Sequence, residues 1–159
     1  MLRPLSLATV LALSLALACG GGDGSDGDDL PTIVVSGAGG AREELTVELA
    51  QTAQERGRGL MGREELPEDG GMLFVFPQDT EAGFWMKDTL IPLSIAFIAA
   101  DGTILDVQDM EPLSEEFHRP PAPYRYALEV NQGWFRERGL GPGDRVVIPD
   151  SVSEATEGE

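Results

Sequence analysis

Short stretches in which apolar and polar residues alternate recur along the middle of the chain. At residues 45–50, three apolar residues alternate with Thr46, Glu48 and Ala50. This period of two is typical of a strand that buries one face. The same alternation, or a short apolar run bounded by glycine or proline, predicts further strands at residues 72–76, 84–87, 93–99, 103–107, 124–130 and 145–148. The pattern therefore predicts a mainly β protein.

Two short helices and one tight turn are predicted between these strands. Thr52 is placed to cap a helix that runs to residue 60, and Asn131 is placed to cap a second helix that ends near Arg138. The dipeptide Asp101-Gly102 is typical of a two-residue hairpin turn. Many short strands separated by turns favour an antiparallel β-sandwich or barrel-like domain with two short helices.

The composition divides the chain into four segments. Residues 1–18 are predicted to be a signal peptide, residues 19–44 a flexible acidic tether rich in Gly and Asp, residues 45–149 one β-rich domain, and residues 150–159 an acidic disordered tail. The tether has too little apolar surface to offset the entropy cost of ordering it, and only a short strand at residues 32–35 is expected there. The proposed domain has a common size.

The first 18 residues have the pattern of a secretory signal. Arg3 precedes an apolar run that is shorter than the roughly 20 residues of a membrane-spanning helix, and Ala16-Leu17-Ala18 is a small-residue cleavage site. Cleavage there would make Cys19, the only cysteine, the first residue. A leader followed by Cys-Gly-Gly resembles a bacterial lipoprotein signal, although Ala16 stands where such signals usually have Leu.

The lipoprotein resemblance implies acyl chains on Cys19 and a firm membrane anchor. We therefore expect an exported protein of the cell envelope, anchored either on the periplasmic side or at the cell surface. The alternative is ordinary cleavage, which would release a soluble periplasmic protein with a free thiol.

Charge and composition exclude several classes of partner. The chain has 28 Asp and Glu residues against 11 Lys and Arg residues, a net charge of −17, whereas nucleic-acid binding needs clustered cations. One cysteine and one histidine, His118, provide neither a disulfide nor a multi-histidine metal site. We expect a monomer with no metal, no cofactor and no nucleic-acid partner.

Residues 84–93 contain the best candidates for a site. Lys87, the only lysine, lies close to Trp85 in otherwise apolar sequence, and Asp88 follows it. On a strand, Trp85 and Lys87 would share a face, where a ring and a cation could hold a small polar or anionic ligand. Lys87 could equally protect an edge strand from pairing.

Three candidates lie outside that segment: Arg58, Glu129 and Asn131. Glu129 and Asn131 would share a face of the strand predicted at residues 124–130 and its continuation. Asn131 is also explained as a helix cap. An internal ion pair explains Arg58 as well as an anionic ligand does.

The order of several motifs resembles a known family. Arg58-Gly59-Leu60-Met61, residues 71–76, residues 84–93 and residues 128–133 follow one another as in the prokaryotic family called domain of unknown function 192. This resemblance implies a small β-rich, sandwich-like domain, often exported or lipid-anchored, with no established activity.

One position departs from the pattern of that family. This chain has Ser94 where members commonly have Asp. If that Asp were an essential acid or metal ligand, the chemistry here would be lost or altered. If it only paired with a loop, Ser94 could substitute for it.

Three functions remain open. The first is a lipid-anchored module that binds a small polar or anionic ligand with Arg58, Trp85, Lys87 and Glu129. The second is a structural or interaction domain of the envelope, in which these residues pair internally. The third is a metal-independent hydrolase or lyase with Glu129 or Asp88 as base and Lys87 as electrostatic stabiliser, which requires Lys87 and Glu129 to converge.

Overall fold

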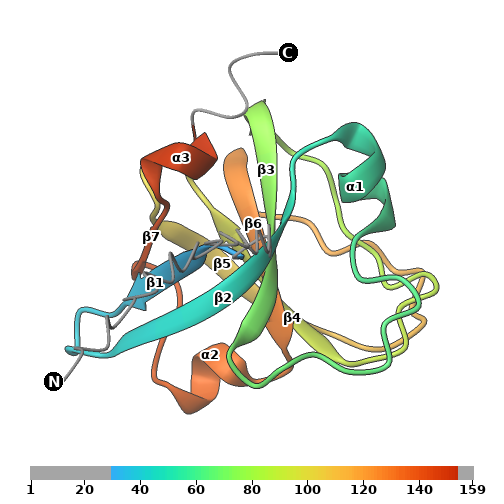
Figure 1. The fold of residues 1–159 in the computed structure, drawn as a ribbon, viewed down its shortest axis with the longest axis horizontal. Helices are drawn as coiled ribbons and strands as arrows, with labels where there is room; N and C mark the ends of the chain where they lie inside the picture. Colours follow the sequence, from blue (N-terminus) through green and yellow to red (C-terminus); the bar gives the residue numbers. More distant parts are fainter. Residues whose placement is uncertain (1–29, 154–159) are drawn as a thin grey trace, which may run out of the picture.

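The computed structural model describes residues 30–153, which form a curled, seven-stranded sheet with three short helices (Figure 1). The strand order is β5-β4-β6-β3-β2-β1-β7. The strands are β1 (Thr32–Ser36), β2 (Arg42–Ala50), β3 (Gly70–Thr80), β4 (Leu93–Ile98), β5 (Ile104–Met110), β6 (Tyr124–Asn131) and β7 (Arg145–Val147). The helices are α1 (Ala53–Arg58), α2 (Trp134–Glu137) and α3 (Asp150–Ser153).

The predicted mainly β, barrel-like class is confirmed, since the sheet curls into a half-barrel. Its edges approach each other at one end, where Thr103 forms a bridge with Arg145. The sheet is mixed rather than wholly antiparallel, because β2 and β3 run parallel. A parallel pair needs a long return connection, which α1 and the loop after it provide. Helix α3 is additional to the two predicted helices.

The folded part extends beyond the predicted residues 45–149 at both ends. β1 pairs with both β2 and β7 and buries Ile33 and Val35 completely. At the other end, Val152 of α3 is buried, so apolar burial orders the segments that border the core. The predicted export signal, Cys19 and residues 154–159 lie outside the described residues. None of the described helices is long and apolar enough to cross a membrane.

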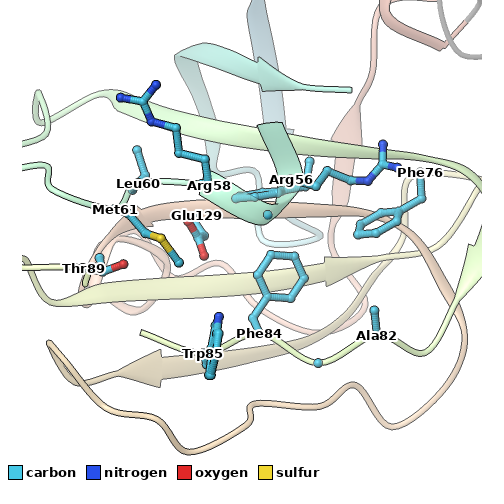
Figure 2. Close-up of a pocket in the computed structure, with 14 residues that line it drawn as sticks. Arg56, Arg58, Leu60, Met61, Phe76, Ala82, Phe84, Trp85, Thr89 and Glu129 are labelled. Carbon is cyan, nitrogen blue, oxygen red and sulfur yellow. The ribbon is translucent and has the colours of Figure 1, made fainter. Parts of the chain in front are cut away.

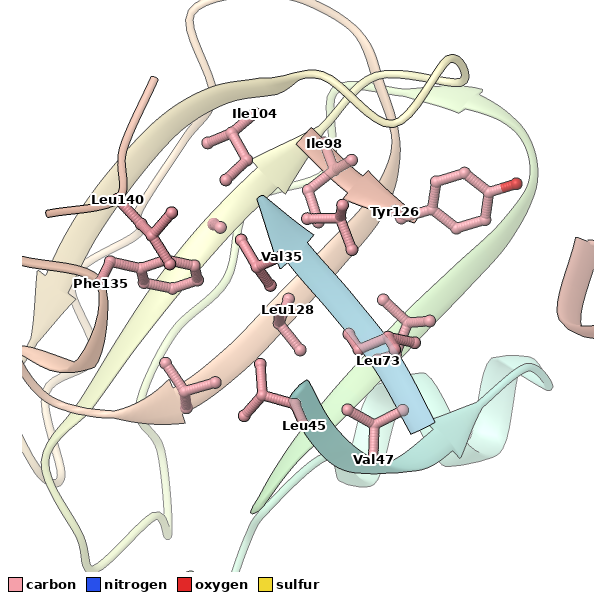
Figure 3. Close-up of a cluster of buried hydrophobic side chains, with 14 of the residues drawn as sticks. Val35, Leu45, Val47, Leu73, Ile98, Ile104, Tyr126, Leu128, Phe135 and Leu140 are labelled. Atoms are coloured by element: carbon pink, nitrogen blue, oxygen red, sulfur yellow. The ribbon is translucent and has the colours of Figure 1, made fainter. Parts of the chain in front are cut away.

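One apolar cluster fills the inside of the curled sheet (Figure 3). All seven strands contribute to it, and α2 and α3 add Trp134, Phe135 and Val152. Burial of this apolar surface is the main favourable contribution to folding. This inner core explains why short strands separated far in sequence close into one curved layer.

A second apolar cluster covers the opposite face of the three central strands β3, β6 and β4. It joins strand side chains such as Phe74 and Ile95 to Leu60 and Met86 from the connections. Two of these connections are held together where Phe84 and His118 exchange backbone hydrogen bonds of 2.9 and 2.7 Å. The central strands are therefore buried on both faces, as near-continuous apolar runs indicate.

Two local predictions are wrong. The strand expected at residues 84–87 is only an isolated bridge at Phe84, because the chain turns at Asp88, where φ is +56°. Asn131 does not cap α2, since Gly133 is the N-cap. The Asn131 amide instead donates hydrogen bonds to the carbonyls of Leu66 and Pro67, at 3.1 and 2.9 Å. It ties the end of β6 to the loop before β3.

The capping role predicted for Thr52 is confirmed. Its side chain accepts a hydrogen bond from the Glu55 amide, and the Glu55 carboxylate accepts one from the Thr52 amide. This reciprocal pair fixes the start of α1. The position of α1 matters because the helix forms one side of the pocket described next.

Candidate functional site

A pocket of about 240 Å³ opens on the covered face of the sheet (Figure 2). It lies between α1 with its following turn on one side and residues 82–85 on the other. Its apolar wall consists of Leu60, Met61, Phe74, Phe76, Phe84 and Trp85. A mainly apolar hollow with few polar groups is the usual form of a small-molecule site. Its volume suits a single ring or a short chain.

The aromatic wall is packed in place. Phe84 meets Phe74 edge-to-face with ring centroids 4.9 Å apart, and it meets Phe76 in the same manner at 6.5 Å. Trp85 is 37 % exposed and stacks on Phe117, with centroids 5.4 Å apart. The pocket is therefore largely preformed, and Trp85 lies at its mouth.

Glu129 is the one acidic side chain that lines the pocket. The alternation of β6 directs it to the covered face, where its cross-strand neighbours are Met72 on β3 and Ile95 on β4. The residue is 4 % exposed, and its carboxyl group points toward the space beside Met61 and Thr89 (Figure 2). Across residues 30–153, no hydrogen bond or ion pair to this carboxyl group is formed, and its oxygens border the pocket space.

Burial raises the pKa of Glu129 to about 8, from an ordinary value of 4.5. The cause is desolvation, which disfavours the charged form. At neutral pH this carboxyl group is therefore protonated and can donate a hydrogen bond. A strongly shifted acid in a pocket is a frequent mark of a functional site.

Two arginines of α1 are the other charged groups along the pocket. Arg56 is occupied, because its guanidinium donates to the carbonyls of Gln51 and Val75 and lies 5.0 Å from the centre of the Phe76 ring. Arg58 is exposed and forms no ion pair within the described part of the chain. Its guanidinium extends away from Glu129 (Figure 2).

The structure brings three of the six candidate ligand-binding residues together, since Arg58, Trp85 and Glu129 all line the pocket. Lys87 does not line it. Its exposed amine lies 5.3 Å from the centre of the Trp85 ring. The predicted hydrolase or lyase required Lys87 and Glu129 to converge, and this geometry does not provide that convergence.

The remaining two candidates have local roles. Asp88 is exposed in the turn after Lys87, and its carbonyl accepts a hydrogen bond of 2.8 Å from the Gly62 amide. Asn131 anchors the loop before β3, as described above. Neither side chain lines the pocket.

Sequence reasoning missed several lining residues: Arg56, Leu60, Met61, Phe74, Phe76, Phe84 and Thr89. Their apolar members look like ordinary core residues, and no local pattern separates a pocket wall from a core. Thr89 is different, because it is a polar residue in an apolar segment and is only 5 % exposed. Its hydroxyl donates a 3.4 Å hydrogen bond to the Lys87 carbonyl.

Ser94 lies on the other face of the sheet from Glu129. In the pairing of β4 with β6, Ile95 is opposite Glu129, whereas Ser94 is opposite Val130 of the inner core. The Ser94 hydroxyl donates to Asp109 at 2.5 Å and accepts from the Gly133 amide at 2.8 Å. Ser94 thus joins β4 to the turn before α2, and its difference from the family does not alter the pocket.

Asp109 connects Ser94 to Arg136 in a polar cluster on this face of the sheet. The hydrogen bond from Ser94 lowers the pKa of the Asp109 carboxyl, and Arg136 lowers it further from 2.9 Å. The group is a fixed structural link. Among residues 30–153, no cluster of three or more His, Cys, Asp or Glu side chains is arranged to hold a metal ion.

Comparison with known proteins gives a family and several similar solved structures. Residues 34–148 match the family model DUF192, described as Uncharacterized ACR. A proposed transcription regulator from Sinorhizobium meliloti 1021 is 39 % identical, with a TM-score of 0.71 over 73 % of this chain and 91 % of that one. A protein of unknown function from Novosphingobium aromaticivorans DSM 12444 is 35 % identical, with a TM-score of 0.71 over 74 % and 84 %. No curated protein matches the sequence.

The raised pKa of Glu129 makes the stability of the fold depend on pH. Between pH 4.5 and about 8 the unfolded chain loses this proton while the folded chain keeps it. The free energy of unfolding of the wild type should therefore fall as pH rises, by at most about 1.4 kcal/mol per pH unit from this group. Glu129→Gln cannot titrate, so its stability relative to the wild type should rise across this window and level off above it.

Urea denaturation at pH 5, 6, 7, 8 and 9 measures this difference. Glu48→Gln is a suitable control, because Glu48 forms a partly exposed ion pair with Arg63 at 2.6 Å outside the pocket. A difference between Glu129→Gln and wild type that stays constant from pH 5 to 9 would contradict the burial-driven shift.

Proposed function

Since this chain belongs to the DUF192 family, whose description names no activity, we propose from its own pocket that it is a small-ligand binding module anchored at the cell envelope. The observation that carries the proposal is the Glu129 carboxyl group, which is buried, without a partner in the described structure, and directed into a preformed pocket.

A purely structural role for Glu129 is disfavoured by its free-energy cost. A carboxyl group that has apolar neighbours, no protein partner and only the pocket space open to it loses part of its hydration, which costs free energy. Leucine at this position would avoid that cost and would suit the neighbours Met72 and Ile95. Departures of this kind from good packing are expected where a site serves function. A ligand that hydrogen-bonds to the carboxyl group would supply the missing partner.

Binding is favoured over catalysis by the composition of the pocket. Proton transfer in a reaction generally needs an acid and a base, or a nucleophile with an adjacent base. Glu129 is the only acid that lines this pocket, and the other charged residues there are Arg56 and Arg58. A binding module needs no second proton-transfer group.

A role in transcription, which one similar protein's description suggests, is disfavoured for this chain. Its net charge of −17 opposes the phosphate backbone. Contacts to DNA would need a basic surface. The proposed module therefore has a small molecule as its partner and no nucleic acid, and it acts as a monomer.

The proposed location rests on the start of the sequence. The apolar leader and Cys19 have the order of a lipoprotein signal. Lipid on Cys19 would attach the pocket domain to the membrane by the segment that precedes β1. A soluble periplasmic form is the alternative.

Glu129→Leu tests the binding function. The substitution replaces the unpaired polar group with an apolar side chain of similar size, so the free energy of unfolding at pH 7 should rise, by at most about 3 kcal/mol. Thermal shifts of the full chain would be measured with small aromatic and aliphatic acids, amides and amines. We expect one class or more to raise the Tm of the wild type and none to raise the Tm of Glu129→Leu.

Glu129→Gln serves as the matched control, since it retains a hydrogen-bond donor of similar size and should keep part of the ligand-induced shift. If no molecule stabilises the wild type, or if Glu129→Leu keeps the same shifts, the binding proposal fails.

Cys19→Ser tests the anchor. When the full-length gene is expressed in a bacterium, the wild type should partition into the detergent phase of a phase-separating detergent, because more than one acyl chain gives stable anchoring. Cys19→Ser should move to the aqueous phase. If both forms remain aqueous, the protein is a soluble exported form instead.

A further inference from the structure

The polar groups around the pocket are mainly hydrogen-bond donors. Protonated Glu129 has one O–H to donate, and the indole of Trp85 can only donate. The indole nitrogen lies on the side of the Trp85 ring that faces Glu129 (Figure 2). Within residues 30–153, this nitrogen forms no hydrogen bond. Two donors thus face one apolar space, and a ligand there needs an oxygen that accepts from both.

The charges around the pocket are positive. Arg56 is held by two backbone carbonyls, but exposed Arg58 forms no ion pair in the described part of the chain. Its long side chain at the end of α1 has the freedom to reorient toward a charge in the mouth. These cations stand out in a chain whose net charge is −17. The overall negative charge disfavours polyanions, so a ligand with one negative charge fits best.

The apolar wall of the pocket determines which kind of apolar group the ligand carries. The aromatic side chains Phe74, Phe76 and Phe84 surround a volume of about 240 Å³. Such a wall favours an aromatic ring or a short alkyl chain, because apolar burial supplies most of the binding free energy in a pocket of this kind.

We propose that the pocket binds a small monocarboxylic acid with an apolar body, whose carboxylate accepts hydrogen bonds from Glu129 and Trp85 while Arg58 balances its charge. This inference rests on the proposed function and specifies the class of ligand. It assigns Trp85 and Arg58 as specificity-determining residues. An amide could accept hydrogen bonds from both donors but has no charge for Arg58 to balance. A protonated amine has no acceptor for the two donors, and Arg58 would repel it.

The mode of binding also couples the ligand to a proton. Glu129 must keep its proton to donate, since an ionised Glu129 would repel the carboxylate. The groups beside it are Met72 from β3, Ile95 from β4 and Thr89 from the connection before β4, and the two arginines of α1 line the same pocket. Glu129 is the only acid among the residues that line the pocket. The affinity should therefore fall as pH rises above about 8, approaching tenfold per pH unit.

A series of three probes with one body tests the class of ligand: 3-phenylpropanoate, 3-phenylpropanamide and 3-phenylpropan-1-amine. Titration calorimetry of the full chain at pH 6.5 should give the tightest binding for the acid, at least about tenfold tighter than for the amine. Trp85→Phe removes the indole donor and keeps a ring. It should weaken binding of the acid by about threefold to tenfold.

Arg58→Met separates the role of charge. It should weaken binding of the acid by a similar factor and leave the affinity for the amide unchanged. Raising the pH from 6.5 to 9 should lower the affinity of the wild type for the acid but not that of Glu129→Gln. Arg125→Met is the matched control, because Arg125 pairs with Asp79 at 2.9 Å and does not line the pocket. It should leave all three affinities unchanged.

The outcomes separate this inference from the binding function. If the amide or the amine binds as tightly as the acid and depends on Glu129, the carboxylate class is wrong and the binding function stands. If the acid binds equally well to Glu129→Leu, both proposals are contradicted. If none of the three probes binds up to about 10 mM, the carboxylate inference is overturned, while the thermal-shift series still decides the binding function.

Discussion

Strand β6 is buried on both faces, and the pocket depends on this double burial. On one side Leu128 and Val130 belong to the inner core, and on the other Ala127 belongs to the covering layer. Glu129 shares that covered side, where α1 and the connections leave it only 4 % exposed. Without this cover, residue 129 would be an ordinary solvated carboxylate. With it, the group stays neutral at physiological pH and becomes a donor in an apolar pocket.

The strands could be predicted because their signals are local. Alternation at residues 45–50 and the apolar run at residues 72–76 identify β2 and β3 without any knowledge of their neighbours. Their parallel pairing could not be predicted in this way, because it depends on a return connection through α1. The short strand expected at residues 32–35 is β1, but its place between β2 and β7 could not be predicted, because that pairing depends on segments distant in sequence.

The site could be predicted in part, because some of its residues also give a local signal in the sequence. Arg58, Trp85 and Glu129 stand out as polar or aromatic residues within family-like motifs, and the fold brings them together. Lys87 looked equally promising, but the turn at Asp88 ends the extended backbone and places the amine outside the pocket. The burial of Glu129 follows from the cover over β6, which is formed by segments distant in sequence. No local pattern contains that information.

The position of Ser94 illustrates how a strand separates neighbouring residues. Ser94 and Ile95 are adjacent in sequence, yet one faces the inner core and its link to α2, and the other faces the layer that holds Glu129. Ser94, which replaces the Asp common in the family, therefore affects the link between β4 and α2 and does not affect the pocket. The pocket is left with one titrating group near neutral pH.

The protonation state of Glu129 is the central claim, and it can be measured directly. Glutamate labelled with ¹³C at the side-chain carboxyl would be incorporated into the full chain, and the Glu129 signal would be assigned as the one that Glu129→Gln lacks. Following its chemical shift from pH 3 to pH 10 gives the pKa of this group. We expect a midpoint near pH 8. A midpoint near the ordinary value of 4.5 would show that the group is ionised at neutral pH, and it would contradict the donor role on which the site depends.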